Sequence, residues 1–485
     1  MQEALIQRLR SAVGHEHVTA RPDDLRNYAY DGSIDRAAPE AVVFPADAAQ
    51  VAAVVRACEE LRCPYVARGA GTGLSGGAIA EFGGVLISTA RMRRILDIDA
   101  ANRTALVEPG VVNAHISAAV ATLGLRFVPD PSSQSACTIG GNVAENAGGL
   151  HCLAYGVTSN HVLGCEIVTP QGEIVWLGGR ENETAGYDLL GVFIGSEGTL
   201  GIATKIAVKL TPQPETTRTL LAVFDSVDDA SKAVSDIIAA GIIPAALEMM
   251  DRLSTQAIEA YVHAGFPTDA GAILIADVDG LQESVGETAA AIGDVCRRDG
   301  AREVRLAKDE AERERIWRGR KSAFGAMGRF SPSYYVQDGV IPRTKLPEVL
   351  AEVEAIGRRY GLLIANVFHA GDGNIHPLIA FDEKVPAQVD AAIAAGADIL
   401  RACVARGGSI SGEHGIGIEK RDCMNVQYAP SDLALMAKLK AVFNPGGLCN
   451  PAKMFPTSRR CGESARTLQR ADLPEGIAPA AGPAF

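Results

Sequence analysis

The chain has 485 residues and 47% of them are hydrophobic, so it is long enough for two or three domains with sizeable cores. A balance of 46 Lys and Arg against 58 Asp and Glu gives a net charge of −12, which excludes general binding to nucleic acid or to anionic lipid. The sequence shows no secretory signal and no apolar run that could span a bilayer. We therefore expect a cytoplasmic protein with no transmembrane segment, peripheral to the inner membrane only through a partner.

The first part of the chain, residues 1–213, alternates helices and short strands with glycine-rich connectors. Helical periodicity is seen at 1–13, 48–61 and 112–124, and short strands are predicted at 64–69, 84–89, 104–110 and 173–178. Gly124 is a typical helix C-cap residue. The proline-containing segment 211–215 predicts a domain boundary.

The second part, residues 214–410, repeats a β-α-β pattern. Strands are predicted at 219–224, 245–251, 271–278 and 302–309, with helices at 227–240 and 282–298. This order predicts a ferredoxin-like sheet with its helices on one face. A charged helix at 308–329, strands at 362–369 and 375–381, and a helix at 386–406 follow.

The last part divides in two. Residues 411–456 contain a predicted helix at 431–443, whereas residues 457–485 lack apolar periodicity and are predicted to be disordered. Taken together, the pattern predicts an α+β protein.

Three glycine-rich clusters lie in the first domain. Residues 68–77, RGAGTGLSGG, contain GxGxxG, but no helix can follow because a strand begins a few residues later. The dinucleotide loop of a Rossmann fold needs that helix, so we expect a pyrophosphate-binding loop in another fold. A ligand-free turn is the alternative, and the hydroxyls of Thr72 and Ser75 argue against it. Similar clusters at 130–149 and 195–204 indicate a long, polar ligand of dinucleotide size.

The sequence HAGDGNIHP, residues 369–377, places two histidines around an Asp-Gly pair. A two-residue type I′ turn at Asp372-Gly373 would put His369 directly opposite His376, with Cβ atoms about 4.5–5.5 Å apart. Such a pair suits a divalent ion. A histidine pair packed in a core is the alternative.

The segment SGEHGIG, residues 411–417, adds Glu413 and His414. Neighbouring side chains point apart in extended backbone, so one can bind a metal while the other faces a substrate. With His369 and His376, Glu413 would complete a two-histidine, one-carboxylate site with open positions, leaving His414 free as a base. The alternative is a glycine-rich turn with two surface polar residues.

These clusters together resemble the FAD-binding domain of the vanillyl-alcohol oxidase/p-cresol methylhydroxylase (VAO/PCMH) family. More narrowly, the chain is similar to the FAD-linked D-2-hydroxyacid dehydrogenases, which include the catalytic flavin subunit of glycolate oxidase and the D-lactate and D-2-hydroxyglutarate enzymes. The resemblance covers residues 31–455. It implies a two-subdomain FAD-binding domain (1–213), a ferredoxin-like substrate or cap domain (214–410) and a C-terminal helical segment that completes the flavin site (411–456).

The resemblance also implies the residues that bind FAD. Because the first loop has no histidine for covalent attachment, we expect non-covalent FAD. The implied residues are Gly69, Ala70, Gly71, Thr72, Gly73, Leu74, Ser75, Pro131, Ser132, Ser133, Thr138, Gly140, Gly141, Asn142, Gly148, Glu197, Gly201, Ile202 and Asn450.

For the reaction, the resemblance supports metal ligands at His369, His376 and Glu413 and a base at His414, and it implies that Arg320 binds the substrate carboxylate. Spacing alone does not single out Arg320 in a helix that carries several cations. Zn²⁺ is the expected ion, with Mn²⁺, Fe²⁺ or Co²⁺ as substitutes. The expected reaction is oxidation of a small D-2-hydroxy acid, with hydride passing from C2 to flavin N5.

The substrate expectation rests on two departures from the family pattern. Relatives that oxidise hydroxyglutarate have Lys where this chain has Val336, and Asn where it has Leu378. Glycolate or D-lactate is therefore expected, with D-2-hydroxyglutarate as the alternative. Two other classes stay open: a non-redox flavin transferase like alkylglycerone-phosphate synthase, and a non-catalytic FAD-binding subunit.

Electrons from the flavin need an acceptor outside the chain. None of the ten cysteines forms a CxxC pair, and no CxxCH haem motif is present, which argues against an internal iron–sulfur cluster or haem. An iron–sulfur partner subunit, an electron-transfer flavoprotein, a quinone or a cytochrome is expected.

Overall fold

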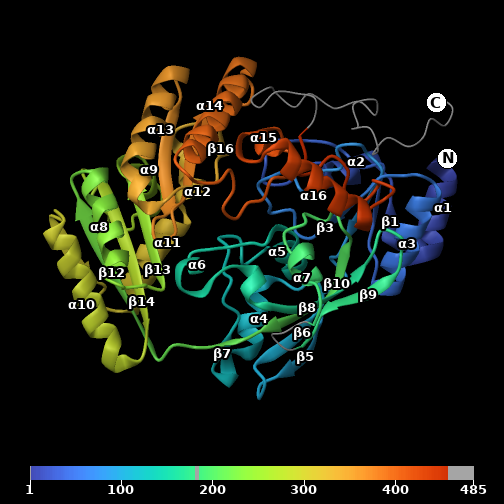
Figure 1. Cartoon of the computed structure of the whole chain (residues 1–485), viewed down its shortest axis with the longest axis horizontal. Helices are drawn as coiled ribbons and strands as arrows, with labels where there is room; N and C mark the ends of the chain where they lie inside the picture. The colour runs from blue at the N-terminus through green and yellow to red at the C-terminus, as the bar shows by residue number, and fades with distance from the viewer. Residues whose placement is uncertain (1, 181–184, 457–485) are drawn as a thin grey trace.

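The computed structural model describes residues 2–180 and 185–456, in two sheet-containing lobes with a C-terminal segment between them (Figure 1). The predicted disorder of 457–485 falls outside the described residues. Within those residues, no helix combines the length and apolar character needed to cross a membrane.

The first subdomain is a four-stranded sheet in the order β1 (Val18–Thr19), β2 (Ala41–Val43), β4 (Val85–Ser88), β3 (Tyr65–Arg68). β2, β4 and β3 run parallel. Helices α1 (Gln2–Val13) and α3 (Ala48–Glu60) cover it through Leu9, Val51 and Val55. α3 begins where the Asp47 carboxylate accepts the N–H of Gln50, an N-cap bond.

The second subdomain is a five-stranded antiparallel sheet. Its order is β5 (Ile95–Asp99), β6 (Thr104–Val107), β10 (Ile202–Lys209), β8 (Val162–Val168), β9 (Ile174–Gly178). Helices α4 (Asn113–Val120), α5 (Ile139–Glu145) and α7 (Leu189–Phe193) pack on it. The predicted C-cap is confirmed, because Gly124 has φ 69° after the short 3₁₀ turn that follows α4. The two-subdomain architecture is thus as predicted.

The cap domain starts with β12 (Thr216–Phe224), close after the predicted boundary. Its sheet has the order β15 (Glu303–Leu306), β12, β14 (Ala272–Gly280), β13 (Ala246–Asp251), β18 (Leu363–His369), β19 (Asn374–Phe381), β16 (Ser333–Val336), and β17 (Gly339–Val340) also pairs with β19. The first four strands have the order of a ferredoxin-like unit, and the later strands extend the same sheet.

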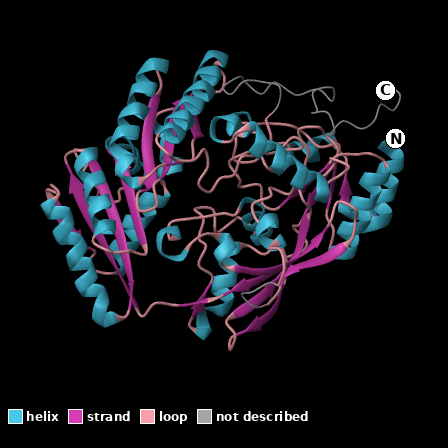
Figure 2. Ribbon diagram, in the orientation of Figure 1, coloured by secondary structure: helices cyan, strands magenta, loops and turns pink. Residues whose placement is uncertain are grey.

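The helices of the two predicted β-α-β units lie on one face of this sheet, as expected, but the full sheet carries helices on both faces. One face carries α8 (Val227–Ala239), α10 (Gln282–Arg298), α13 (Leu346–Tyr360) and α14 (Pro386–Ala405), and the other carries α9 (Arg252–Val262), α11 (Glu310–Lys321) and α12 (Ala323–Ala326) (Figure 2). The sequence of β12 explains this. Successive residues such as Leu220 and Leu221 point to opposite faces of the sheet, and both are apolar, so each face has its own core.

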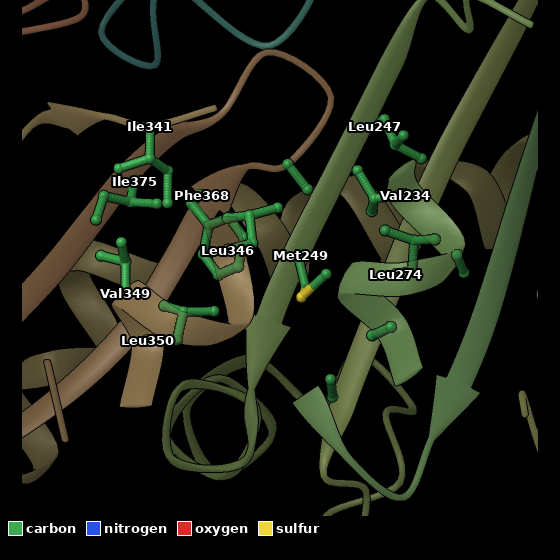
Figure 3. Close-up of a cluster of buried hydrophobic side chains, with 14 of the residues drawn as sticks. Val234, Leu247, Met249, Leu274, Ile341, Leu346, Val349, Leu350, Phe368 and Ile375 are labelled. Atoms are coloured by element: carbon green, nitrogen blue, oxygen red, sulfur yellow. The ribbon is translucent and has the colours of Figure 1, made fainter. Parts of the chain in front are cut away.

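The larger core lies where the ferredoxin-like unit joins the added strands. Figure 3 shows Met249 of β13 and Phe368 of β18 beside Leu346 and Val349 of α13. This packing fixes the place of β18 against β13, which matters for the site described below. The predicted helix 308–329 is interrupted at Ser322, between α11 and α12.

The C-terminal segment runs from α14 back across the first lobe through α15 (Met424–Gln427) and α16 (Pro430–Phe443) (Figure 1). The Glu197 carboxylate accepts the N–H groups of Ile416 and Gly417, each at 2.6 Å. The Ser75 carbonyl accepts the N–H of Ile418 at 2.9 Å. These bonds attach residues 416–418 to two of the glycine-rich loops.

Candidate active site

One cavity, of about 360 Å³, is lined by all three glycine-rich clusters and by the cap. The cap and the C-terminal segment contribute Arg320, Lys321, Phe324, His369, His376, Glu413 and His414. Residues expected to bind a cofactor and residues expected to perform chemistry therefore share one space.

Most of the residues predicted to bind FAD line this cavity. They are Gly69, Ala70, Gly71, Thr72, Gly73, Leu74, Pro131, Ser132, Ser133, Thr138, Gly140, Gly141, Asn142, Gly148, Glu197, Gly201 and Ile202. Ser75 and Asn450 lie outside the lining. Ser75 instead holds the C-terminal segment, and the Asn450 amide donates to the carbonyls of Gly77 (3.0 Å) and Glu197 (2.6 Å).

The lining fits a dinucleotide held against backbone. The segment between β3 and β4 contains no helix, so the loop at 69–77 is not a Rossmann loop, as predicted. A Cβ atom at Gly73 would meet nothing within 4 Å, and one at Gly141 would meet only the Thr138 hydroxyl, at 3.5 Å. That hydroxyl is buried and has no hydrogen-bond partner among the described residues. Open space beside glycine backbone and an unpaired hydroxyl suit a polar ligand.

On the cap side, His369, His376 and Glu413 converge. Oε1 of Glu413 lies 3.1 Å from Nε2 of His369 and 3.2 Å from Nε2 of His376. The centroids of the two imidazole rings are 5.0 Å apart, and the ring planes are nearly perpendicular, at 88°. Both histidines are buried, so three ligand atoms of the kinds that bind zinc face one another in a protected place.

The histidines do not meet as the turn prediction had it. In the hairpin of β18 and β19, His369 is opposite Asn374, and His376 is opposite Val367. The loop between the strands is Ala370–Gly373, and only Gly373 in it has positive φ, 81°, so no type I′ turn forms. The Asp372 carboxylate instead accepts the N–H of Asn374 at 3.1 Å. The two rings meet diagonally on the same face of the hairpin.

The electrostatics of this cluster favour positive charge. Burial raises the pKa of Glu413, but the two histidines outweigh it and hold that pKa well below its usual range. Burial lowers the pKa of His369, but Glu248 and Glu413 raise it well above the ordinary value. A divalent cation supplies positive charge to such a place and displaces the proton.

His414 lies next to the cluster as a neutral base. Its ring stacks on the ring of His376, with 4.9 Å between the ring centroids and an interplanar angle of 4°. Burial lowers the pKa of His414 to about 4, with the charge of His376 adding to the effect. Its Nδ1 is buried and has no partner among the described residues. An uncharged imidazole with a free nitrogen can accept a proton from a ligand in the cavity.

Asp338, a residue that sequence reasoning missed, holds the segment that carries Glu413 and His414. This buried carboxylate accepts the N–H groups of Gly412 (3.0 Å), Glu413 (3.2 Å) and His414 (2.9 Å), and the ammonium of Lys420 (3.0 Å). Asp338, His376 and His414 also lie close enough to form a second metal-binding set. Because the Asp338 oxygens already accept these donors, we assign it to positioning.

Arg320 does line the cavity, but it is paired. Its Nε lies 2.9 Å and its Nη2 2.6 Å from Oε2 of Glu248. The other oxygen of Glu248 lies 2.7 Å from Nδ1 of His369. Sequence reasoning missed Glu248, and the available signal was an acid between the apolar residues Leu247 and Met249 of a predicted strand.

Three further charged residues line the cavity without having been predicted: Arg68, Lys321 and Glu145. Burial, with Glu197 nearby, raises the pKa of Glu145 well above its usual value, which favours the protonated carboxyl. Its position inside the glycine-rich cluster, in NVAENAGG, was the available signal.

Comparisons with known proteins agree with this arrangement. Residues 39–178 match the family model described as "FAD binding domain", and residues 213–454 match "FAD linked oxidases, C-terminal domain". The chain is 50% identical to glycolate oxidase subunit GlcD of Escherichia coli, over 95% of this chain and 92% of that protein. It is 33% identical to a D-lactate dehydrogenase of Anaerostipes hadrus, over 86% and 90%.

The fold is also similar to a solved structure of p-cresol methylhydroxylase. The TM-score is 0.80 at 19% identity, with 94% of this chain and 97% of that chain covered. The two-lobed architecture is therefore that of the VAO/PCMH family.

Proposed function

We propose, from the premise that the chain belongs to the family of FAD-linked D-2-hydroxyacid dehydrogenases within the VAO/PCMH family, that it oxidises glycolate or D-lactate to the 2-oxo acid with a divalent cation and His414 as base. FAD-linked oxidation of a hydroxy acid is the activity of the family. The observation that carries the finer proposal is the meeting of His369, His376, Glu413 and His414 in the cavity lined by the FAD loops.

Each residue has a defined task in this proposal. His369, His376 and Glu413 hold the cation, proposed to be Zn²⁺, which supplies Lewis acidity toward a hydroxyl group. His414 accepts the hydroxyl proton on its free nitrogen. Arg320 lies at the cavity wall, where its guanidinium can pair with the substrate carboxylate. FAD, when bound, supplies the hydride acceptor.

Two apolar residues of the cap support a small monocarboxylate. Val336 and Leu378 are opposite each other on β16 and β19 and are buried in an apolar core. Neither offers a polar partner to a second carboxylate. D-2-hydroxyglutarate therefore remains the less favoured substrate.

The electron acceptor is proposed to lie outside this chain. The relative from E. coli is named a subunit, which supports a partner protein such as an iron–sulfur subunit. An electron-transfer flavoprotein, a quinone or a cytochrome would serve the same purpose.

Anaerobic flavin reduction tests the proposal. Glycolate, D-lactate, L-lactate and D-2-hydroxyglutarate are added separately to FAD-loaded protein, before and after chelation and after Zn²⁺ is restored. We expect glycolate or D-lactate to bleach the flavin fastest, chelation to stop this, and Zn²⁺ to restore it. Fastest bleaching by D-2-hydroxyglutarate would contradict the substrate, full activity after removal of metal would contradict the cation, and no bleaching by any acid would favour a non-redox flavin enzyme.

A further inference from the structure

Glu248 connects two parts of the site, because it contacts both His369 and Arg320. It lies on β13, opposite His369 on β18, so the two side chains share one face of the sheet. One carboxylate oxygen lies 2.7 Å from Nδ1 of His369, and the other pairs with the guanidinium of Arg320 at 2.6–2.9 Å. The carboxylate side chain is 0% exposed, and that of Arg320 is 4% exposed.

The first consequence concerns the tautomer of His369. A carboxylate only accepts hydrogen bonds, so Nδ1 carries the hydrogen. Nε2, which faces Glu413 at 3.1 Å, is then the nitrogen whose lone pair can bind a cation. Histidine ligands of metals are commonly fixed in this way by a carboxylate.

The second consequence concerns charge. Arg320 is a permanent cation, and it shares the Glu248 carboxylate with His369, a proposed ligand of a second cation. Glu248 balances the guanidinium inside the protein, where charges are poorly screened.

We propose that Glu248 is a positioning residue that fixes the tautomer of His369 and balances the charge of Arg320, so that one buried carboxylate sets the affinity of the cation site. The inference rests on the proposed function, because it presumes that His369, His376 and Glu413 bind a divalent cation. Glu248 itself does not line the cavity, which distinguishes it from a ligand.

The test is Zn²⁺ affinity, measured by competition with a chromogenic chelator on the FAD-loaded full-length protein without substrate. Glu248→Gln keeps the shape but offers only one acceptor atom for two donors, and Glu248→Ala removes both contacts. We expect each to weaken Zn²⁺ binding about 10- to 100-fold. FAD content and thermal midpoint are measured beside it, so that the affinity refers to folded protein.

Two controls make the result specific. Arg320→Met breaks the same ion pair but leaves Glu248 on His369, so Zn²⁺ should bind as tightly as in the wild type or more tightly. Asp251→Asn changes another carboxylate of the same strand, which bonds Ser254 and Asn366 and not the site, and should leave affinity unchanged.

The outcomes separate the two proposals. A wild type that binds no Zn²⁺ contradicts the proposed cation. If the wild type binds Zn²⁺ and Glu248→Gln binds it with equal affinity, only the role of Glu248 is contradicted. An equal loss in Glu248→Gln and Arg320→Met also contradicts it, because the effect is then that of breaking any buried ion pair.

Discussion

At the scale of single residues, the site depends on buried charges that support one another. Glu413 and Glu248 flank His369, and Asp338 collects the backbone N–H groups beside His414. Glu248 and Asp338 are buried, Glu413 is partly buried, and each is satisfied by several donors, which is the condition for keeping a charge inside a protein. The charged side chains of the site are thus held by one another.

His414 should be the residue whose loss affects chemistry most selectively. His414→Gln keeps a polar side chain but removes the proton acceptor, so we expect flavin reduction at saturating substrate to slow about 10²- to 10⁴-fold. Stopped-flow absorbance of the flavin under anaerobic conditions measures this. His115→Gln, an exposed histidine on α4, should behave as the wild type. An undiminished rate in His414→Gln that still holds FAD and metal would mean that another group takes the proton.

His369, His376, Glu413 and His414, which we propose to touch the metal or the substrate, could be picked out from the sequence, whereas the residues that support them could not. The two histidines of the HAGDGNIHP hairpin and the Glu-His pair of SGEHGIG are visible as local patterns in the sequence. Glu248 and Asp338 act on partners 121 and 76 positions away, and only the fold brings them together.

At the scale of elements, the hairpin of β18 and β19 shows what local rules decide and what they leave out. The Asp-Gly pair does mark the connection between two strands. The Asp372 side chain, however, competes for the N–H of Asn374, and the loop extends to Ala370–Gly373. Because both histidines keep the same face, the metal hypothesis is unaffected by the change in register.

The contact between the first glycine-rich loop and the C-terminal segment is also tight. Gly417 has φ 52°, and a Cβ there would lie 2.0 Å from the Ser75 carbonyl oxygen. Gly417→Ala should therefore push these segments apart, weaken FAD binding and lower the thermal midpoint by several degrees. Flavin fluorescence on dilution and a melting curve measure the two effects.

Gly124→Ala is the matched control for that variant. Gly124 also has positive φ, 69°, but a Cβ there would meet nothing within 4 Å. We expect a cost of about 1 kcal/mol from backbone strain and unchanged FAD affinity. Equal FAD loss in both variants would show that backbone strain, and not the contact with Ser75, controls flavin binding.

The cap sheet is wider than the predicted ferredoxin-like unit, and long-range strand pairing explains why. The two β-α-β units could be predicted, and their strand order is ferredoxin-like. That β18, β19 and β16 would join the same sheet depends on long-range pairing, such as Met249 with Phe368, which periodicity does not encode. A wider sheet with apolar residues on both sides then needs helices on both faces.

At the scale of the whole molecule, the site exists because two lobes and the segment between them meet. The FAD loops come from the first lobe, His369 and His376 from the cap sheet, and Glu413 from the segment that runs back between them (Figure 1). Contacts away from the site also join the lobes: Asp279 of the cap accepts from Arg126 (3.0 Å) and Tyr155 (2.7 Å) of the first domain. The chemistry is therefore a property of the assembled chain.

The central claim is that His369, His376 and Glu413 bind one divalent cation in the FAD cavity. Crystals of the FAD-loaded protein, grown with Zn²⁺ and measured on both sides of the zinc absorption edge, test it directly. We predict an anomalous peak about 2.0–2.1 Å from Nε2 of both histidines and from an oxygen of Glu413. Well-ordered crystals with bound flavin and no peak between these three side chains would contradict the account.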